Sequence, residues 1–321
     1  MDKKQQDELK QLCNETSEVT TEFKSLKDIK ITLLDKTINP YKVMFDMGLQ
    51  TWTSNGEKWS KASPELRFEV VKRVLLKQAL PLALEAPVFS FQVENVSRAA
   101  FDQIARTRYG VVFASKGWKD DNLQDTGFMI PSFFLTDDCK EELGLLKTIV
   151  TAIKEDYAAF VKHNIPNWAA RCVLPIYGLH NFTMTINFLA LQQFCANRMQ
   201  TTEMEDTVAV AWLLREKIKE HFPLLAEYLR PSCDWQHKDT TMQVNGFADV
   251  LGVPHSSDNR QRGYDHEKIP SVKWSFPCTD MKTIERECNI KVPMIHEWID
   301  YEFKDLKSQD KKLFNDNEQS K

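Results

Sequence analysis

The sequence predicts a globular protein that combines several helices with at least one β-strand. Three segments support this prediction: a helix-start signal at Ser63-Pro64-Glu65, alternating apolar and polar side chains over residues 87–93, and apolar positions at helical spacing over residues 141–163. The 321 residues are 42% hydrophobic and include 19 Phe and 8 Trp, which is enough apolar surface for a substantial core. We therefore expect one large domain or two.

Charge and cysteine usage limit the class of protein. The net charge is −4 and the isoelectric point is about 6.0, whereas a general nucleic-acid-binding domain is basic. Seven scattered cysteines without C-x-x-C spacing favour neither a disulfide framework nor a zinc ribbon, and the seven histidines show no metal-binding spacing. No run of about eighteen apolar residues occurs. We expect a cytoplasmic protein that binds no nucleic acid, membrane or metal.

The first well-marked helix is predicted to begin at residue 64. Ser63 can cap it, Pro64 suits the first helical position, and Glu65 places an acid in the first turn. Its apolar face is expected to consist of Leu66, Val70, Val71, Val74 and Leu75.

A half-buried strand over residues 87–93 is expected next, followed by a helix that Ser97 can cap and Gly110 can end. This helix would carry Arg98, Arg106 and Arg108. Three guanidinium groups within eleven residues, with Asp102 as the only acid among them, indicate a site for an anion.

Further helices are predicted over residues 141–163, 176–200 and 203–230, the last ended by Pro231. Residues 231–281 are rich in turn-forming and aromatic residues and are expected to be irregular. The aromatic side chains expected to form a satellite core there are Trp235, Phe247, Tyr264, Trp274 and Phe276. We predict a polar N-terminal extension (1–28), a main domain (29–230), an irregular aromatic segment packed on it (231–302) and a peripheral charged tail (303–321).

Two blocks of polar residues keep a fixed spacing. The first is Gln103-x-x-Arg106-Thr107-Arg108 with Ser115 after it, and the second runs from Ala170-Arg171 through Asn187 to Arg198. Together they resemble the flavin-dependent thymidylate synthases, the ThyX family, whose signature is R-H-R followed by a serine. The resemblance covers about residues 30–230 and is more specific than a single R-x-R motif.

The resemblance implies an α+β domain with a small, mostly antiparallel sheet packed by helices. It also implies a homotetramer whose active sites draw residues from several subunits. The implied reaction transfers a one-carbon unit from methylenetetrahydrofolate to C5 of dUMP, giving dTMP, with FAD as cofactor and NADPH as the reductant of the flavin.

The same resemblance assigns roles to individual residues. Arg198 and Ser115 match catalytic positions, and a guanidinium at the base edge would stabilise the negative charge that develops on the ring carbonyls. The residues expected to bind the nucleotide are Gln103, Ser115, Lys116, Arg171 and Arg198. The residues expected to bind FAD are Arg106, Thr107, Arg108, Asn187 and Gln193.

The chain departs from the family pattern at several positions. Thr107 stands where the signature has His, Glu85-Ala86-Pro87 replaces the segment that carries another family His, and Trp118 ends the loop that follows Ser115 where the family has Tyr. These departures leave two alternatives open. One is a hydroxymethylase of the same fold acting on dUMP or dCMP, and the other is a non-catalytic nucleotide-binding relative.

Overall fold

The structure is a computed structural model that describes residues 21–50, 58–78, 80–119, 122–200, 203–232, 279–293, 297–298 and 300–316. The chain forms two compact units. Unit 1 contains residues up to Lys30, Val93–Ile104 and Ala114–Phe182, and unit 2 contains Ile31–Gln92, Ala105–Phe113 and residues from Thr183 onwards. Among the described residues, no helix is both long and apolar enough to cross a lipid bilayer.

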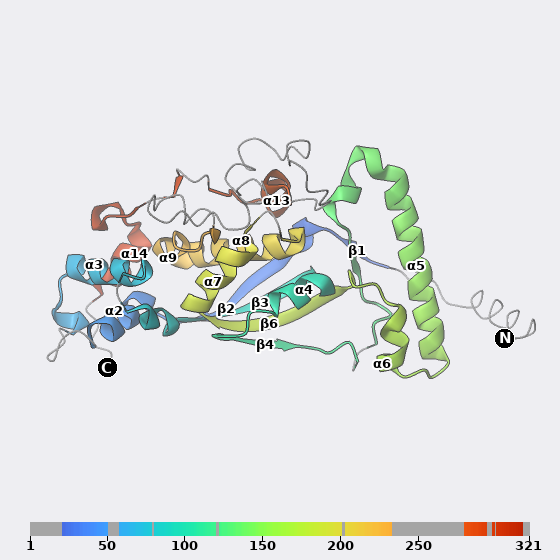
Figure 1. The fold of residues 1–321 in the computed structure, drawn as a ribbon, viewed down its shortest axis with the longest axis horizontal. Coiled ribbons are helices and arrows are strands. Elements are labelled where there is room, and N and C mark those ends of the chain that lie inside the picture. Colours follow the sequence, from blue (N-terminus) through green and yellow to red (C-terminus); the bar gives the residue numbers. More distant parts are fainter. Residues whose placement is uncertain are drawn as a thin grey trace, which may run out of the picture. The chain divides into compact units, whose positions relative to one another are not determined.

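Four strands form a small antiparallel sheet, which confirms the α+β class (Figure 1). In spatial order they are β2 (Lys30–Lys36), β3 (Val88–Ser97), β6 (Leu179–Asn187) and β4 (Val111–Ser115). A second sheet pairs β1 (Phe23–Lys24) in parallel with β5 (Phe128–Met129).

The predicted strand and its helix cap are confirmed. Phe89, Phe91 and Val93 alternate with less buried side chains along β3 and are fully buried. At the end of β3, the Ser97 hydroxyl accepts a hydrogen bond of 2.9 Å from the backbone nitrogen of Ala100 in α4 (Arg98–Ile104).

The helix α4 is shorter than predicted, because it ends at Ile104 and not at Gly110. The backbone nitrogen of Asn187 donates to the carbonyl of Gly110 (2.8 Å), so the chain pairs with the end of β6 instead of continuing the helix. Gly110 has φ +70°, a left-handed conformation that favours glycine. Arg106 and Arg108 therefore follow the helix and do not lie on it.

Unit 1 contains the long helix α5 (Lys140–Lys162), which matches the predicted helix over 141–163, and the short helix α6 (Asn167–Ala170). Lys154 on α5 is 3% exposed, and its ammonium group donates to the carbonyls of Leu123 (2.7 Å) and Thr126 (2.5 Å). Burial lowers the pKa of Lys154 to about 8. These contacts fix the turn that follows residue 122 against α5.

Unit 2 is mainly helical. Its helices are α2 (Pro40–Gln50), α3 (Pro64–Leu75), α7 (Phe188–Arg198), α8 (Glu205–His221), α9 (Pro223–Ala226), α13 (Met281–Cys288) and α14 (Ser308–Asn315). Ser63 caps α3 as predicted, accepting from the backbone nitrogen of Leu66 at 3.2 Å. Leu66 itself is 41% exposed, so it does not belong to the predicted apolar face, and Phe68 is buried on α3.

Two of the later helix predictions are wrong in part. Residues 179–187 are the strand β6, in which His180, Phe182, Met184 and Ile186 are buried at a period of two. The helix begins only at Phe188, where Asn187 caps it by accepting from the backbone nitrogen of Ala190 (2.9 Å). The helix predicted over 203–230 is interrupted, because α8 ends at His221 and Pro223 starts α9.

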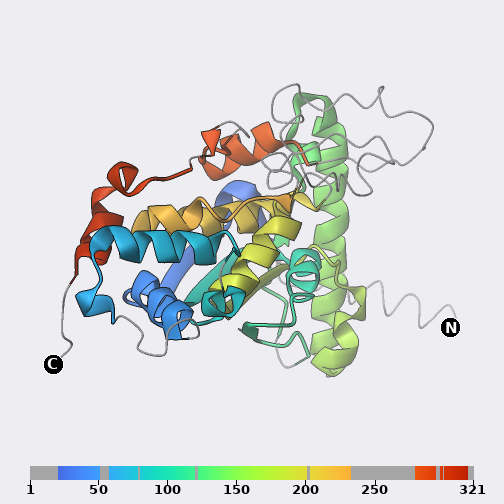
Figure 2. The same ribbon diagram turned by 60° about the vertical axis from the view of Figure 1, so that its left-hand side comes forward.

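Residues 303–316 were predicted to belong to a peripheral tail, but they pack on the core of unit 2. Phe314 on α14 is fully buried and stacks on Tyr41 of α2 with ring centroids 4.6 Å apart. The buried Arg67 of α3 donates from Nη1 to the Phe314 carbonyl (2.5 Å). Helices α2, α3 and α9 all contact α14 (Figures 1 and 2). The aromatic group expected between residues 235 and 276 lies outside the described residues.

The buried carboxyl group of Asp310 is expected to make stability depend on pH. It accepts from the hydroxyl of Tyr41 and from the backbone nitrogen of Leu224 (2.9 Å), yet burial raises its pKa to about 6. The unfolded chain loses this proton near pH 4 and the folded chain keeps it until about pH 6, so the folded state is destabilised by about 3 kcal/mol as pH rises through this window.

The measurement is the free energy of unfolding of wild type and Asp310→Asn between pH 4 and pH 6.5. Asp310→Asn is expected to become more stable relative to wild type as pH rises, because the amide cannot ionise. Asp137→Asn is the control, since the Asp137 side chain is 93% exposed. Parallel profiles for wild type and Asp310→Asn would show that Asp310 does not titrate in this window.

Candidate functional site

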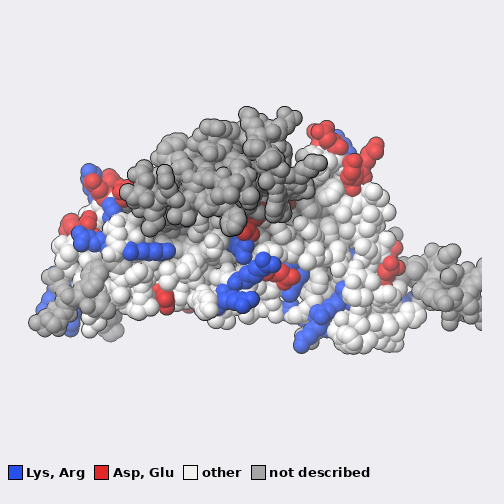
Figure 3. Space-filling view, viewed as in Figure 1, with Lys and Arg blue, Asp and Glu red and all other residues white. Residues whose placement is uncertain are grey.

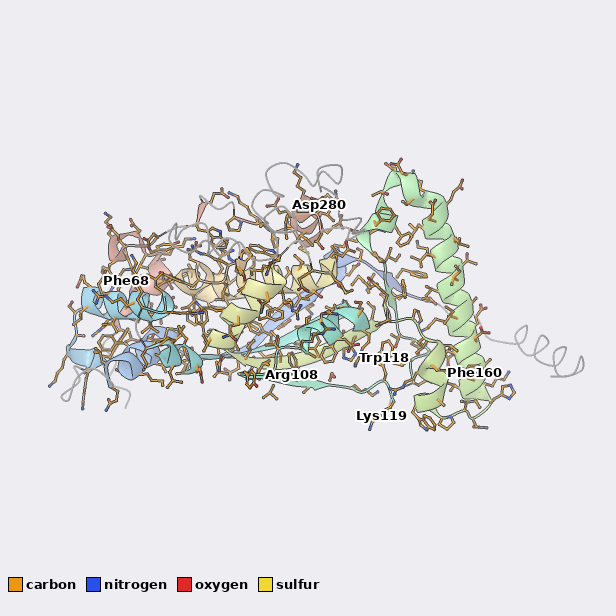
Figure 4. All side chains as sticks on the ribbon, viewed as in Figure 1. Phe68, Arg108, Trp118, Lys119, Phe160 and Asp280 are labelled. Carbon is orange, nitrogen blue, oxygen red and sulfur yellow. The ribbon has the colours of Figure 1, made fainter. Side chains whose placement is uncertain are left out.

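Two clefts contain the arginines singled out by the sequence, one in each unit. The first, which we call the Arg171 cleft, lies in unit 1 and has a volume of about 540 Å³. It is lined by Arg98, Gly117, Trp118, Lys119, Trp168, Arg171 and Cys172. Figure 4 shows Trp118 and Lys119 beside α6, the helix that precedes Arg171.

Packing on the core of unit 1 fixes the position of Trp118. Its ring lies on the buried cluster formed by Leu123, Tyr157 and Ala170. It also covers Gly178, where an added Cβ would lie only 3.0 Å from the indole Cη2. A side chain at position 178 would therefore displace the indole that forms one wall of the cleft.

Arg98 and Arg171 both bring positive charge to this cleft, but their side chains make different contacts. Arg98 is the first residue of α4, and its Nη2 pairs with Asp102 at 3.1 Å while its Cζ lies 5.9 Å from the Trp118 ring centre. Arg171 is exposed, and its Nε donates to the carbonyl of Trp168 at 3.2 Å. With Lys119, three cations line the cleft, and of the described residues only Asp102 forms a salt bridge with one of them. This charge suits an anionic ligand.

His180 lies buried near α4 and remains neutral at physiological pH. Its ring centre is 4.5 Å from that of Phe101, and it is 4% exposed. Burial, together with the charge of Arg98, lowers the pKa of His180 to about 4. His180 therefore adds no positive charge near Arg98.

The second cleft, the Arg198 cleft, lies in unit 2 and has a volume of about 230 Å³. It is lined by Arg106, Thr107, Arg108, Tyr109, Gln193, Phe194, Asn197 and Arg198. Helix α7 supplies the last four, as two pairs of residues one turn apart. The segment between α4 and β4, in which Figure 4 labels Arg108, supplies the other four.

Close packing against the Asn187 side chain fixes the segment that carries Arg106 and Arg108. An added Cβ on Gly110 would lie 2.6 Å from Nδ2 of Asn187, so only glycine allows the chain to approach the end of β6 this closely. Tyr109, which precedes this glycine, is 87% exposed. Tyr109 thus contributes an exposed aromatic ring to the lining of the Arg198 cleft.

Arg198 is held in place by an ion pair. Its Nη1 lies 2.7 Å from Oε2 of Glu203, and the two side chains are only 14% and 24% exposed. A partly buried pair of this kind is stronger than an exposed one, because water screens it less. Arg198 thus lines the cleft with its direction set by a carboxylate.

The structure divides the predicted site residues between the two clefts. Arg106, Thr107, Arg108 and Gln193, four of the five predicted flavin contacts, lie together with Arg198. The fifth, Asn187, uses its side-chain oxygen to cap α7.

The predicted nucleotide contacts are separated. Arg171 lines the other cleft, and Gln103, Ser115 and Lys116 line neither of these two clefts. Gln103 is half-buried on α4, and Ser115 is exposed at the end of β4.

Several cleft residues were not assigned to the site from the sequence. These are Trp118, Trp168, Cys172, Tyr109, Phe194 and Asn197. Trp168 precedes Arg171 by three residues, and Asn197 follows Gln193 by four, so helical spacing around the predicted residues was the available signal. Trp118 required the fold, because a loop places it.

Positive charge at the surface is local. Figure 3 shows the lysine and arginine side chains of one face in short groups separated by uncharged surface. Within the described residues, no group of three or more His, Cys, Asp or Glu side chains is placed to hold a metal ion.

Comparisons with known proteins give a family and a fold. A family model described as thymidylate synthase complementing protein (Thy1) matches residues 32–224, more than half of the chain. A flavin-dependent thymidylate synthase of Sulfurisphaera tokodaii is 25% identical over 150 residues, which are 47% of this chain and 57% of that protein. One of Saccharolobus solfataricus is 26% identical over 152 residues, which are 47% of this chain and 56% of that protein. The chain thus spans little more than half the length of these relatives.

Among solved structures, the UMP/dUMP methylase PolB from Streptomyces cacaoi bound with 5-Br dUMP has a TM-score of 0.55 and 16% identity. The match covers 64% of this chain and 96% of that chain. At this level of identity, the likeness shows the shared fold.

Proposed function

Because the chain belongs to the family of thymidylate synthase complementing proteins (Thy1), we propose that it transfers a one-carbon unit to C5 of a deoxypyrimidine monophosphate, converting dUMP to dTMP. The family match confirms the resemblance to flavin-dependent thymidylate synthases. The proposed cofactor is FAD, with NADPH as reductant and methylenetetrahydrofolate as the one-carbon donor. The proposed location is the cytoplasm.

The observation that supports this proposal is the Arg198 cleft, which is lined by three arginines, two amides and an exposed tyrosine. Guanidinium groups suit the diphosphate and ring oxygens of a flavin, and an aromatic ring suits its planar system. The residues present therefore fit part of FAD. When bound, the flavin supplies the redox chemistry, which protein side chains cannot provide.

The roles proposed for the chain's own residues follow from their chemistry. Arg106 and Arg108 hold the flavin, with Thr107 and Gln193 beside them. Arg198 donates to a pyrimidine carbonyl and stabilises the negative charge that grows there as C5 becomes nucleophilic. Asn187 contributes its amide nitrogen, because its oxygen caps α7.

The phosphate is proposed to bind at the Arg171 cleft, where Arg171 offers a planar fork of donors and Lys119 a flexible point charge. The exposed Ser115 and Lys116, together with Gln103, are proposed to complete the nucleotide site. In the proposed homotetramer, residues of neighbouring subunits complete each active site. Exposed apolar side chains in unit 1 support such assembly, since Phe133 is 69%, Leu145 61% and Ile149 47% exposed.

One experiment separates this function from its alternatives. The purified protein is expected to be yellow, to shift its flavin spectrum on addition of dUMP, and to release deuterium from C5-labelled dUMP when the flavin is reduced. Release without dTMP formation, or release from labelled dCMP, would indicate the hydroxymethylase or dCMP alternatives. Binding of dUMP without release would indicate a non-catalytic nucleotide-binding relative and contradict the proposal.

Arg106→Ala is expected to weaken FAD binding about tenfold, the effect of losing one charge-assisted contact. Arg106 is exposed, so the unfolding temperature should stay close to that of wild type. Spectrophotometric titration of the apoprotein with FAD measures the change. Arg73→Ala, at an exposed position on α3, is the matched control. Equal FAD affinities in Arg106→Ala and wild type would remove Arg106 from the flavin site.

A further inference from the structure

Glu203 connects Arg198 to a part of the chain outside the family match. Its carboxylate pairs with Arg198 at 2.7 Å, and its backbone carbonyl accepts a hydrogen bond of 2.6 Å from the hydroxyl of Thr279. Thr279 is 8% exposed and lies well beyond residue 224, where the family match ends. Thr279 therefore holds Glu203 in place, and Glu203 in turn holds Arg198, which lines the cleft.

The segment that carries Thr279 is itself well anchored. The side chain of Asp280 caps α13 by accepting from the backbone nitrogens of Lys282 (3.1 Å) and Thr283 (3.2 Å). Met281 and Ile284 of α13 are fully buried, and α13 packs on α8 (Figures 1 and 2). The hydroxyl of Thr279 consequently has a fixed position from which to hold Glu203.

The arginines of the two clefts differ in charge balance. Arg198 is paired with a carboxylate and is mostly buried. Arg171 is exposed and forms no salt bridge with a carboxylate of the described residues, and it shares its cleft with Arg98 and Lys119. An anion therefore gains more Coulomb energy at Arg171 than at Arg198, whose charge Glu203 has already compensated.

Resting on the proposed function, we infer that Glu203 is a specificity-determining residue, which compensates and orients Arg198 so that the Arg198 cleft takes the uncharged carbonyl edge of the pyrimidine and not its phosphate. A guanidinium carries five N–H donors, so one ion pair does not exhaust its capacity to donate. A neutral carbonyl needs a well-aimed donor more than a net charge, whereas a phosphate dianion is drawn mainly by net charge. Thr279 is the positioning residue that keeps Glu203 in place.

Dissociation constants of two probes, dUMP and inorganic phosphate, test this role in the full-length protein loaded with FAD. Glu203→Ala is expected to bind dUMP about tenfold more weakly and to bind phosphate about threefold more tightly at the Arg198 cleft, because the guanidinium there loses its orientation but gains net charge. Glu203→Gln keeps a hydrogen-bond acceptor for Arg198, so its dUMP affinity should stay within about threefold of wild type while phosphate still binds more tightly.

Thr279→Val keeps the shape of the side chain and removes its hydroxyl donor. It is expected to weaken dUMP binding about threefold with phosphate affinity unchanged, since the charge of Glu203 remains. Glu220→Ala is the matched control, because Glu220 forms an ion pair of the same 2.7 Å length with Lys217 at an exposed position on α8. Neither probe should change affinity in that variant.

A protein that is only destabilised would not bind dUMP more weakly and phosphate more tightly at the same time. Weaker binding of both probes in Glu203→Ala and Glu203→Gln, unchanged dUMP affinity in Glu203→Ala, or a wild-type protein that binds no dUMP would each overturn the inference. The proposed function is tested separately by C5 deuterium release from the wild-type protein. A protein that binds both probes as expected but releases no deuterium would retain this role for Glu203 and lose the proposed reaction.

Discussion

Arg198→Ala is expected to lower the turnover of dUMP about 10²–10³-fold, the usual effect of removing one preorganised donor from a developing anion. The guanidinium lines the Arg198 cleft and is aimed by Glu203, so no other side chain can replace it at the same place without moving. FAD affinity should change little, because Arg106 and Arg108 remain. The measurement is kcat for dTMP formation together with deuterium release at C5.

The Arg198→Lys variant sharpens this test. Lysine keeps the positive charge but lacks the planar fork, so it should recover only a small part of the activity. The carboxylate of Glu203 is 24% exposed and can be solvated when its partner is removed, so Arg198→Ala should still fold. Full turnover in Arg198→Ala would mean that the pyrimidine does not bind at this cleft.

Phe314→Ala is expected to destabilise the protein by about 3–5 kcal/mol, the cost of deleting a large buried ring. Phe314 is fully buried, stacks on Tyr41, and has further ring contacts with Phe68 (5.8 Å) and Phe303 (6.4 Å) between ring centroids. Denaturant unfolding measures the loss.

Ile38→Ala is the control for this substitution. The Ile38 side chain is 88% exposed, so its removal should change the free energy of unfolding by about 0.5 kcal/mol or less. A loss below about 1 kcal/mol in Phe314→Ala would show that α14 contributes little to the core of unit 2.

The C-terminal helix illustrates how composition can mislead. Half of residues 303–316 are charged, which is typical of a solvated tail, yet Leu306, Asp310 and Phe314 are all buried. Asp310 and Phe314 are four apart on α14 and so lie on one face of this helix, whereas Leu306 precedes it. The sequence pattern does not indicate this face because one of its two members is an aspartate, whose burial depends on donors from Tyr41 and Leu224, far away in the sequence.

The segment 176–200 shows a second limit of sequence patterns. It contains many apolar residues, and a long apolar run does not by itself distinguish a buried helix from a strand followed by a helix. The alternation of buried positions from His180 to Ile186 indicates the strand, and Asn187 marks the start of the helix as its cap. Residues 179–187 form a strand and not a helix because they pair with β3 and β4.

The sequence by itself determined the family, the α3 and α5 helices, the strand β3 and the cap at Ser97, because each depends on residues close together in the chain. It also picked out Arg106, Arg108, Arg171 and Arg198 by their spacing. Only the tertiary structure decided that Arg198 lies with Arg106 and Arg108 while Arg171 lies with Trp118 and Trp168.

The same is true of the partners of Arg198. Nothing in the local pattern around residue 203 indicates that its carboxylate would hold Arg198 or that Thr279, 76 residues away, would hold its carbonyl. Such contacts arise when α13 packs on α8, and packing depends on apolar faces that meet only in the folded chain. Local order is encoded by neighbouring residues, whereas the site is assembled by surfaces that the fold brings together.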